Sequence, residues 1–249
     1  MFDKKKYKKF AKMQLKSRWL TPVIMTLITC VIISIMNLPE LRESFQDLKE
    51  SKFLLQFSSE NSVNITRNMF FSAPRDTNLF NEIISWAALL AEFILAFANL
   101  SVYIKMSHGP EPVTLSSFIE GLSQWAKGIV CGLWKSLWVF LWSLLFIIPG
   151  IVKAYAYSQT EYLLLEYPEL SVTKAMKISI QITRGHKGDL FIQDLSFIGW
   201  AILASIPMGL GWLWLTPYIS MTKVNAFHGL LKDAVTGGVI SQEDLSSSY

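Results

Sequence analysis

The sequence predicts an all-α membrane protein, a polytopic bundle of about six transmembrane helices. Hydrophobic residues make up 51% of the chain, only 17% of residues are charged, and the mean hydropathy is +0.34. This composition is too apolar for an ordinary soluble domain. Six mostly apolar stretches are each roughly 17–22 residues long, which is the length that a helix needs to cross a bilayer. The connections between them alternate between rich and poor in lysine.

The first three predicted spans are residues 19–38, 83–104 and 128–148. Pro22 lies in the opening turn of the first span, where its missing N–H costs nothing. The second span carries one carboxylate, Glu92, near its centre, and the third carries Lys135. The third span ends at Pro149 and Gly150, a turn signal, so the chain is expected to reverse there.

The last three predicted spans are residues 151–167, 190–208 and 212–231. The fourth is less apolar than the others because it contains Lys153, Glu161 and several tyrosines. A turn from Pro207 to Gly211 is expected to join the fifth and sixth spans into a hairpin. Together, residues 83–231 form a predicted membrane domain of five spans.

An amphipathic helix is predicted over residues 171–184, between the fourth and fifth spans. Ser171 is a suitable N-cap, and Ala175, Ile178 and Ile182 recur at helical spacing. We expect this helix to lie at the cytoplasmic membrane interface.

The distribution of Lys and Arg predicts that both termini are cytoplasmic. Residues 1–18 hold eight Lys and Arg against the single Asp3, and cationic segments are retained in the cytoplasm. Six crossings bring the tail, residues 232–249, to the same side, together with the basic stretch 174–187. Five crossings would place that stretch outside, so the charges favour six. The loop 39–82 is then extracytoplasmic.

The basic N-terminal segment has two interpretations. It is a topology signal alone, or it forms a short helix on the surface of anionic lipid, where each cation contributes on the order of 1 kcal/mol. In the second case the candidate lipid contacts are Lys4, Lys5, Lys6, Lys8, Lys9 and Lys12.

Charged residues inside the predicted spans are the best pointers to function. A charge at the bilayer centre costs at least about 2.5 kcal/mol, so it is usually paired or faces a polar cavity. By depth, Lys135 and Asp194 are expected to pair. For the lysines, snorkelling or structural pairing competes with ligand contact; for the carboxylates, ion or proton handling competes with a structural role. The candidate polar site consists of Glu92, Lys135, Glu161, Asp194 and Lys223.

Enzyme motifs are missing from the sequence, which contains no His-Glu-x-x-His, Gly-rich phosphate loop or G-x-S-x-G motif. We therefore expect no catalytic residue, cofactor or metal, and no nucleic-acid partner. The histidines, His108, His186 and His228, are expected near cytoplasmic span ends, where packing or capping explains them. Cys30 and Cys131 lie in predicted spans and predict no disulfide.

Four ordered blocks resemble a known family. They are IPGIVKAYAYS (148–158), YPELS (167–171), RGHKGDLF (184–191) and LSFIGW (195–200). They resemble an uncharacterised bacterial integral-membrane family, domain of unknown function 975 (DUF975), over residues 80–232 and more weakly over 1–35. The resemblance implies a multi-pass protein of the bacterial inner, or cytoplasmic, membrane and no particular activity.

Two functional hypotheses follow. The first is an accessory or scaffold protein that binds another membrane protein or forms a homo-oligomer, with membrane lipids around it. Gly128 and Gly132, four residues apart, would permit a close helix approach. The alternative is a small transporter or lipid-handling protein that uses the intramembrane carboxylates.

Overall fold

A computed structural model of the chain describes residues 2–16, 18–36, 79–109, 114–206 and 209–246. Every regular element in these ranges is a helix, which confirms the predicted all-α class. Most of the expected loop 39–82, and Pro207 in the expected turn, lie outside them. The helices are α1 (Lys4–Leu15), α2 (Leu20–Met36), α6 (Leu79–His108), α7 (Leu115–Ser123), α8 (Trp125–Leu145), α9 (Ile147–Ala156), α10 (Thr160–Glu166), α11 (Val172–Ile182), α12 (Lys187–Leu195), α13 (Ile198–Ser205), α14 (Trp212–Thr236) and α15 (Gln242–Ser246).

The chain divides into two compact units. One comprises Met1–Ile28 and Phe93–Tyr249, and the other comprises Thr29–Glu92. The boundaries fall within α2 and α6. The larger unit contains helices α7 to α15, α1 and the second half of α6, and the sites described below all lie in it.

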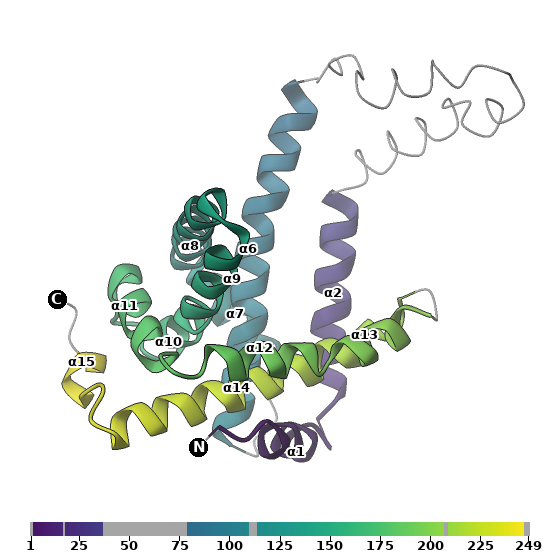
Figure 1. Ribbon diagram of the computed structural model, residues 1–249. Coiled ribbons are helices and arrows are strands. Elements are labelled where there is room, and N and C mark those ends of the chain that lie inside the picture. Colours follow the sequence, from purple (N-terminus) through teal and green to yellow (C-terminus); the bar gives the residue numbers. More distant parts are fainter. Residues whose placement is uncertain (1, 17, 37–78, 110–113, 207–208, 247–249) are drawn as a thin grey trace, which may run out of the picture. The chain divides into compact units, whose positions relative to one another are not determined.

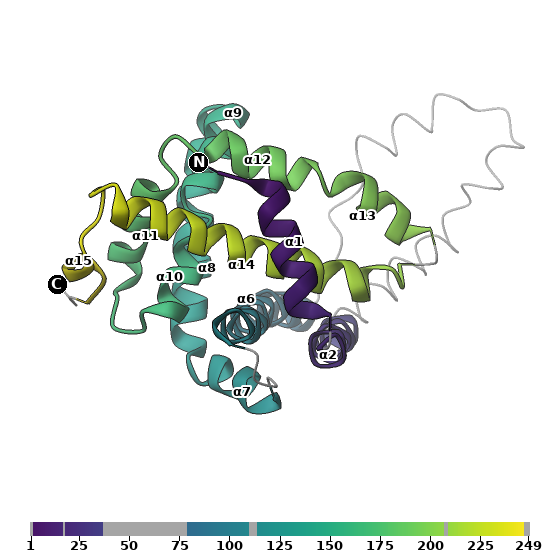
Figure 2. The same ribbon diagram turned by 90° about the horizontal axis from the view of Figure 1, so that it is seen from below.

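Helix α14 is central to the larger unit. It packs against α1, α11 and α13, and Figures 1 and 2 show it running crosswise to the lower part of α6 with α1 laid across it. Met221, Val224 and Phe227 are completely buried along α14. These buried residues recur three apart, which is the spacing of one helical face.

Helix α1 is amphipathic and docks on α14. Asp3 caps its N-terminus by accepting hydrogen bonds from the backbone N–H groups of two lysines, at 3.0 and 3.1 Å. Tyr7, Ala11 and Leu15 are spaced by four residues, and all three are buried. One apolar face therefore fixes the helix to the protein, while most of its lysines remain at the surface.

The predicted spans correspond only partly to single helices. Residues Glu82–His108 of α6 and Trp125–Leu145 of α8 are long and apolar enough to cross a membrane. In contrast, the stretch 151–167 is divided between α9 and α10, and the stretch 190–208 between α12 and α13. Figures 1 and 2 also show α8 running crosswise to the second half of α6. The six spans and their topology stay a prediction.

The reversal between α8 and α9 occurs earlier than expected. Phe146 is extended, with φ −159° and ψ 147°, and separates the two helices. Pro149 is the third residue of α9, where a helix has no use for the backbone N–H that proline lacks. Pro149 and Gly150 therefore begin the second helix of this hairpin and do not form its turn.

Helix α11 lies within the range predicted for the interfacial helix. Ser171 Oγ accepts from the backbone N–H of Lys174 at 3.4 Å, and Gly185 follows the helix with φ +86°. The expected apolar stripe is buried, but α8, α10 and α14 pack against this helix. Protein therefore covers the stripe, and the expected place of this helix at the cytoplasmic membrane interface stays a prediction.

Candidate functional site

Four of the five charged residues singled out from the sequence line one cavity of about 390 Å³. Each comes from a different helix: Lys135 from α8, Glu161 from α10, Asp194 from α12 and Lys223 from α14. Helices α8, α9, α10 and α12 are held together by the α8–α9, α10–α8 and α12–α9 contacts. The fold therefore gathers two cations and two anions from positions far apart in the sequence.

These charges form two ion pairs. Lys135 Nζ donates to Glu161 Oε1, and Lys223 Nζ lies 3.1 Å from Asp194 Oδ1. The hydroxyl of Tyr155 donates to the second oxygen of Asp194 at 3.1 Å. The expected pairing of Lys135 with Asp194 is therefore wrong, because α10 packs on α8 and brings Glu161 to Lys135 instead.

Two amide side chains add unused acceptors to the cavity wall. Gln159 and Gln193 are 5% and 1% exposed, both line the cavity, and the Oε1 atom of each has no hydrogen-bond partner among the described residues. A buried acceptor left without a donor costs about 1–3 kcal/mol. A bound group that carries N–H or O–H donors would recover this cost if a side-chain rotation turned these oxygens toward the cavity.

The cavity combines balanced charge with apolar walls. Its two cations and two anions cancel, while Val139, Ala154 and Leu190 also line it. Outside it, α12 exposes Phe191 and Ile192. The arrangement suits a group that carries both signs of charge and is attached to something apolar.

The fifth candidate and the N-terminal lysines lie elsewhere. Glu92 is exposed on α6 and belongs to the other unit. Of the lysines on α1, Lys5, Lys6, Lys9 and Lys12 are exposed, and Lys4 is half-buried. Lys8 instead faces the protein: its Nζ donates to Ser196 Oγ at 2.7 Å and lies 4.0 Å from the centre of the Phe197 ring. Burial, together with nearby Lys4 and Lys12, lowers the pKa of Lys8.

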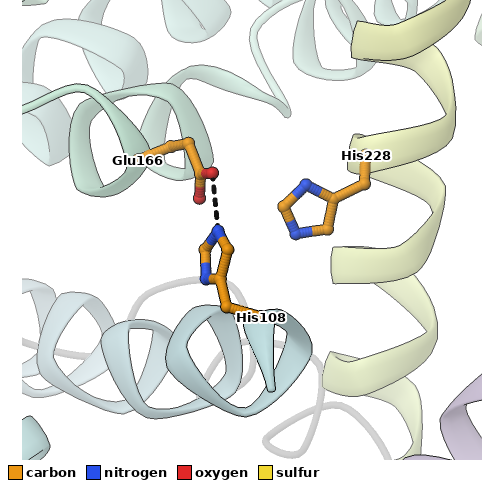
Figure 3. Close-up of side chains that lie close together, drawn as sticks. All are labelled: His108, Glu166 and His228. Carbon is orange, nitrogen blue, oxygen red and sulfur yellow. Dashed lines mark hydrogen bonds and ion pairs between the residues drawn. The ribbon is translucent and has the colours of Figure 1, made fainter.

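A second cluster was not expected from the sequence. His108 at the end of α6, Glu166 at the end of α10 and His228 on α14 direct their side chains at one another (Figure 3), and their ligand-type atoms all lie within 4.8 Å of one another. They border a second cavity of about 820 Å³. No short spacing motif links three residues from three separate helices, so the sequence carried no signal for this cluster.

Comparison with known proteins identifies part of the chain. Residues 147–234 match the family model described as "Protein of unknown function (DUF975)". These residues are a DUF975 domain. The match confirms the family for the four sequence blocks, which all lie within it, and it runs from the start of α9 into α14. The resemblance expected over residues 80–146 and 1–35 lies outside the match and stays a prediction. No curated protein and no solved structure matches the chain.

The DUF975 domain supplies most of both clusters. Glu161, Asp194 and Lys223 of the first cavity lie within it, as do Glu166 and His228 of the second cluster. Lys135 of the first cavity comes from α8, and His108 of the second cluster comes from α6. Both positions precede the matched domain. Both clusters are thus completed by helices that precede the matched region.

Proposed function

We propose that this protein is integral to a membrane and binds the zwitterionic headgroup of an amphiphile, an amine-bearing phospholipid, in the cavity between α8, α10, α12 and α14. This is the lipid-handling alternative predicted from the sequence. The bacterial cytoplasmic membrane is the location that the proposal assumes.

Exposed apolar surface supports the membrane part of the proposal. At the end of the α8–α9 hairpin, Leu144, Ile147 and Ile148 are 78%, 76% and 75% exposed. Burying such side chains stabilises by roughly 1.5–3 kcal/mol each, and contiguous apolar patches are uncommon on soluble monomers. Helices α6 and α8 also have the length and composition of membrane spans. Hydrocarbon is the environment that fits this surface.

The unpartnered oxygens of Gln159 and Gln193 are the observation on which the proposed ligand rests. The oxygen atoms are themselves buried, and the two glutamines line a cavity that already holds two lysines and two carboxylates. An ammonium group offers three donors to those oxygens and to the carboxylates, while a phosphate accepts from the lysines. A headgroup with both signs of charge can therefore pair with the lysines and the carboxylates of the wall, whereas a simple anion or cation can pair with only one of these two groups.

The scaffold hypothesis gains no comparable support. Gly128 and Gly132, which would allow a partner helix to approach closely, face Phe93 and Phe97 of α6 in the same unit. The protein's own helix therefore occupies that surface. A partner protein or homo-oligomer stays a prediction.

Lipid retention measured by native mass spectrometry tests the proposal. The purified full chain is offered equal amounts of phosphatidylethanolamine, which is zwitterionic, and phosphatidylglycerol, which is anionic. We expect preferential retention of phosphatidylethanolamine. Retention of phosphatidylethanolamine should fall at least about tenfold in the double variant Glu161→Gln, Asp194→Asn, since a hydrogen bond to a charged group contributes about 1.5–3 kcal/mol.

Glu120→Gln is the matched control because it breaks the Lys105–Glu120 ion pair outside the cavity. This control should retain phosphatidylethanolamine as the unaltered protein does. Competition by soluble glycerophosphoethanolamine distinguishes a headgroup site from simple coating by lipid. Equal retention of the two lipids, or an unchanged preference in the double variant, would refute the proposal.

A further inference from the structure

The cluster of His108, Glu166 and His228 has the donor set of a metal site. Two imidazole rings and a carboxylate, from α6, α10 and α14, converge on one space (Figure 3). The rings of His108 and His228 meet edge to face, with centroids 5.5 Å apart. His108 Nε2 lies 2.8 Å from Glu166 Oε1. Two nitrogens and one oxygen are the ligands of many three-ligand zinc sites.

The hydrogen bonds of His108 require either a proton or a metal ion in this space. Its Nδ1 lies 2.9 Å from the carbonyl oxygen of Ile104, which can only accept, so Nδ1 carries a hydrogen. In a neutral ring Nε2 is then an unprotonated acceptor, yet it faces a carboxylate oxygen at 2.8 Å. Either a proton or a metal ion must lie between these two atoms. A metal ion would use the lone pairs of both.

The second histidine is oriented in a complementary way. Ser107 Oγ donates to the carbonyl oxygen of Ile104 at 2.6 Å, and its hydroxyl hydrogen is thereby used. With the hydroxyl hydrogen used in this way, the contact of 2.8 Å between Ser107 Oγ and His228 Nε2 is made by the tautomer that carries its hydrogen on Nε2. In that tautomer the Nδ1 lone pair of His228 is left for a ligand. Such outer hydrogen bonds, which set the tautomer of each ligating histidine, are typical of metal sites.

The carboxylate of Glu166 gives an independent indication of a bound cation. Glu166 Oε2 is buried and has no hydrogen-bond partner among the described residues, although the glutamate side chain as a whole is 15% exposed. A buried carboxylate oxygen without a donor or cation is costly. A bound cation removes that cost, and the proton between His108 and Oε1 does not.

We propose that His108, Glu166 and His228 bind a divalent first-row transition ion, with zinc as the best fit, and that its fourth coordination position opens onto the adjacent cavity. Imidazole favours zinc and its neighbours, whereas Mg²⁺ and Ca²⁺ prefer oxygen alone. Tetrahedral ligands about 2.0–2.2 Å from the ion lie about 3.4 Å apart. That spacing falls between the 2.8 Å contact and the 4.8 Å limit of the cluster, so the ligand atoms already lie near the separations that a tetrahedral site needs.

Binding of the ion would connect α6, α10 and α14. The cavity beside it is lined by Ser107, Asn225 and Lys232 among others, so the open position faces polar groups, and water or an anionic oxygen can occupy it. The headgroup cavity has none of the three ligands in its wall. Failure of either proposal therefore leaves the other standing.

Metal binding by the full chain is the direct test. The detergent-solubilised protein, carrying no polyhistidine tag, is stripped with chelator and dialysed against Zn²⁺, and bound metal is measured by plasma mass spectrometry. We expect one Zn²⁺ per chain, and with Co²⁺ in its place the visible absorption of a tetrahedral nitrogen–oxygen site. Metal content at background in the unaltered protein would overturn the proposal.

Three variants, His108→Gln, Glu166→Gln and His228→Gln, each remove one ligand while keeping a similar volume. Each should weaken Zn²⁺ binding by more than the 10- to 100-fold that loss of an outer partner typically costs. His186→Gln is the matched control, since His186 pairs with Asp189 outside the cluster, and it should bind as the unaltered protein does. Glu166→Gln, which changes least in shape, distinguishes ligand loss from misfolding. Equal Zn²⁺ binding by all four variants would also refute the proposal.

Discussion

Replacing Gly132 by alanine tests the packing of α8 on α6. A Cβ atom at Gly132 would lie 2.5, 2.6 and 2.9 Å from three atoms of the Phe93 ring. Ordinary van der Waals contact begins near 3.4 Å, so the ring must move by up to about 1 Å. Overpacking of this kind costs typically about 1–3 kcal/mol.

Gly128, one turn earlier on the same helix, is the matched control. A Cβ atom there would lie 3.1 and 3.3 Å from Phe97 and 3.5 Å from a backbone oxygen. The neighbours need to give by only a few tenths of an ångström. Both substitutions gain the same helix propensity, about 1 kcal/mol for Gly to Ala. The difference between the two variants therefore isolates the contact with Phe93.

Thermal unfolding in detergent measures this difference. Gly132→Ala should have a Tm at least about 2 °C below that of Gly128→Ala, because about 1 kcal/mol corresponds to 2–4 °C for a chain of this size. The ranking of the two variants is the informative result. If Gly132→Ala is as stable as Gly128→Ala, or more stable, then α8 does not pack on α6 through these glycines.

Two further predictions concern stability. Leu15→Ala removes a fully buried side chain from α1 and should lower the free energy of unfolding, measured by chemical denaturation, by about 2–5 kcal/mol. The control Phe10→Ala, at a side chain 38% exposed, should change this free energy by less than about 1 kcal/mol. Equal losses in the two variants would contradict the docking of α1. The second prediction concerns the coupling free energy of ion pairs, measured by double-mutant cycles. The Lys135–Glu161 pair, whose side chains are 27% and 28% exposed, should give about 1–3 kcal/mol. The Lys105–Glu120 pair, whose side chains are 42% and 60% exposed, should give less than about 1 kcal/mol. Couplings of the same size would show that cavity burial does not strengthen the ion pair.

Local features of the structure were largely predictable. Ser171 was recognisable as an N-cap because capping depends on one side chain and the next three residues. The stripe of Ala175, Ile178 and Ile182 followed from helical periodicity. The packing of protein against this stripe did not follow from the sequence, because periodicity indicates only that a face is apolar. It leaves open whether protein or lipid lies against that face. The breaks within the fourth and fifth stretches were missed since hydropathy averages over them.

The candidate site was predictable as a set of residues and not as a set of contacts. Charges in apolar stretches stand out in a sequence because such placement is costly, and this drew attention to Lys135, Glu161, Asp194 and Lys223. Which lysine meets which carboxylate depends on how α8, α10, α12 and α14 pack, and the pairing inferred from depth alone was wrong.

Composition, periodicity and ordered blocks are properties of neighbouring residues, and they were enough to predict a helical, apolar chain with a stretch that resembles DUF975. The sharing of one cavity by two ion pairs, and the meeting of His108, Glu166 and His228, became visible in the folded chain alone. No short motif surrounds His108, Glu166 or His228 in its own segment, and the sequence does not show which of the four cavity charges pair. Their chemistry arises from distances across separate helices, and those distances are set by the packing of side chains far apart in the chain.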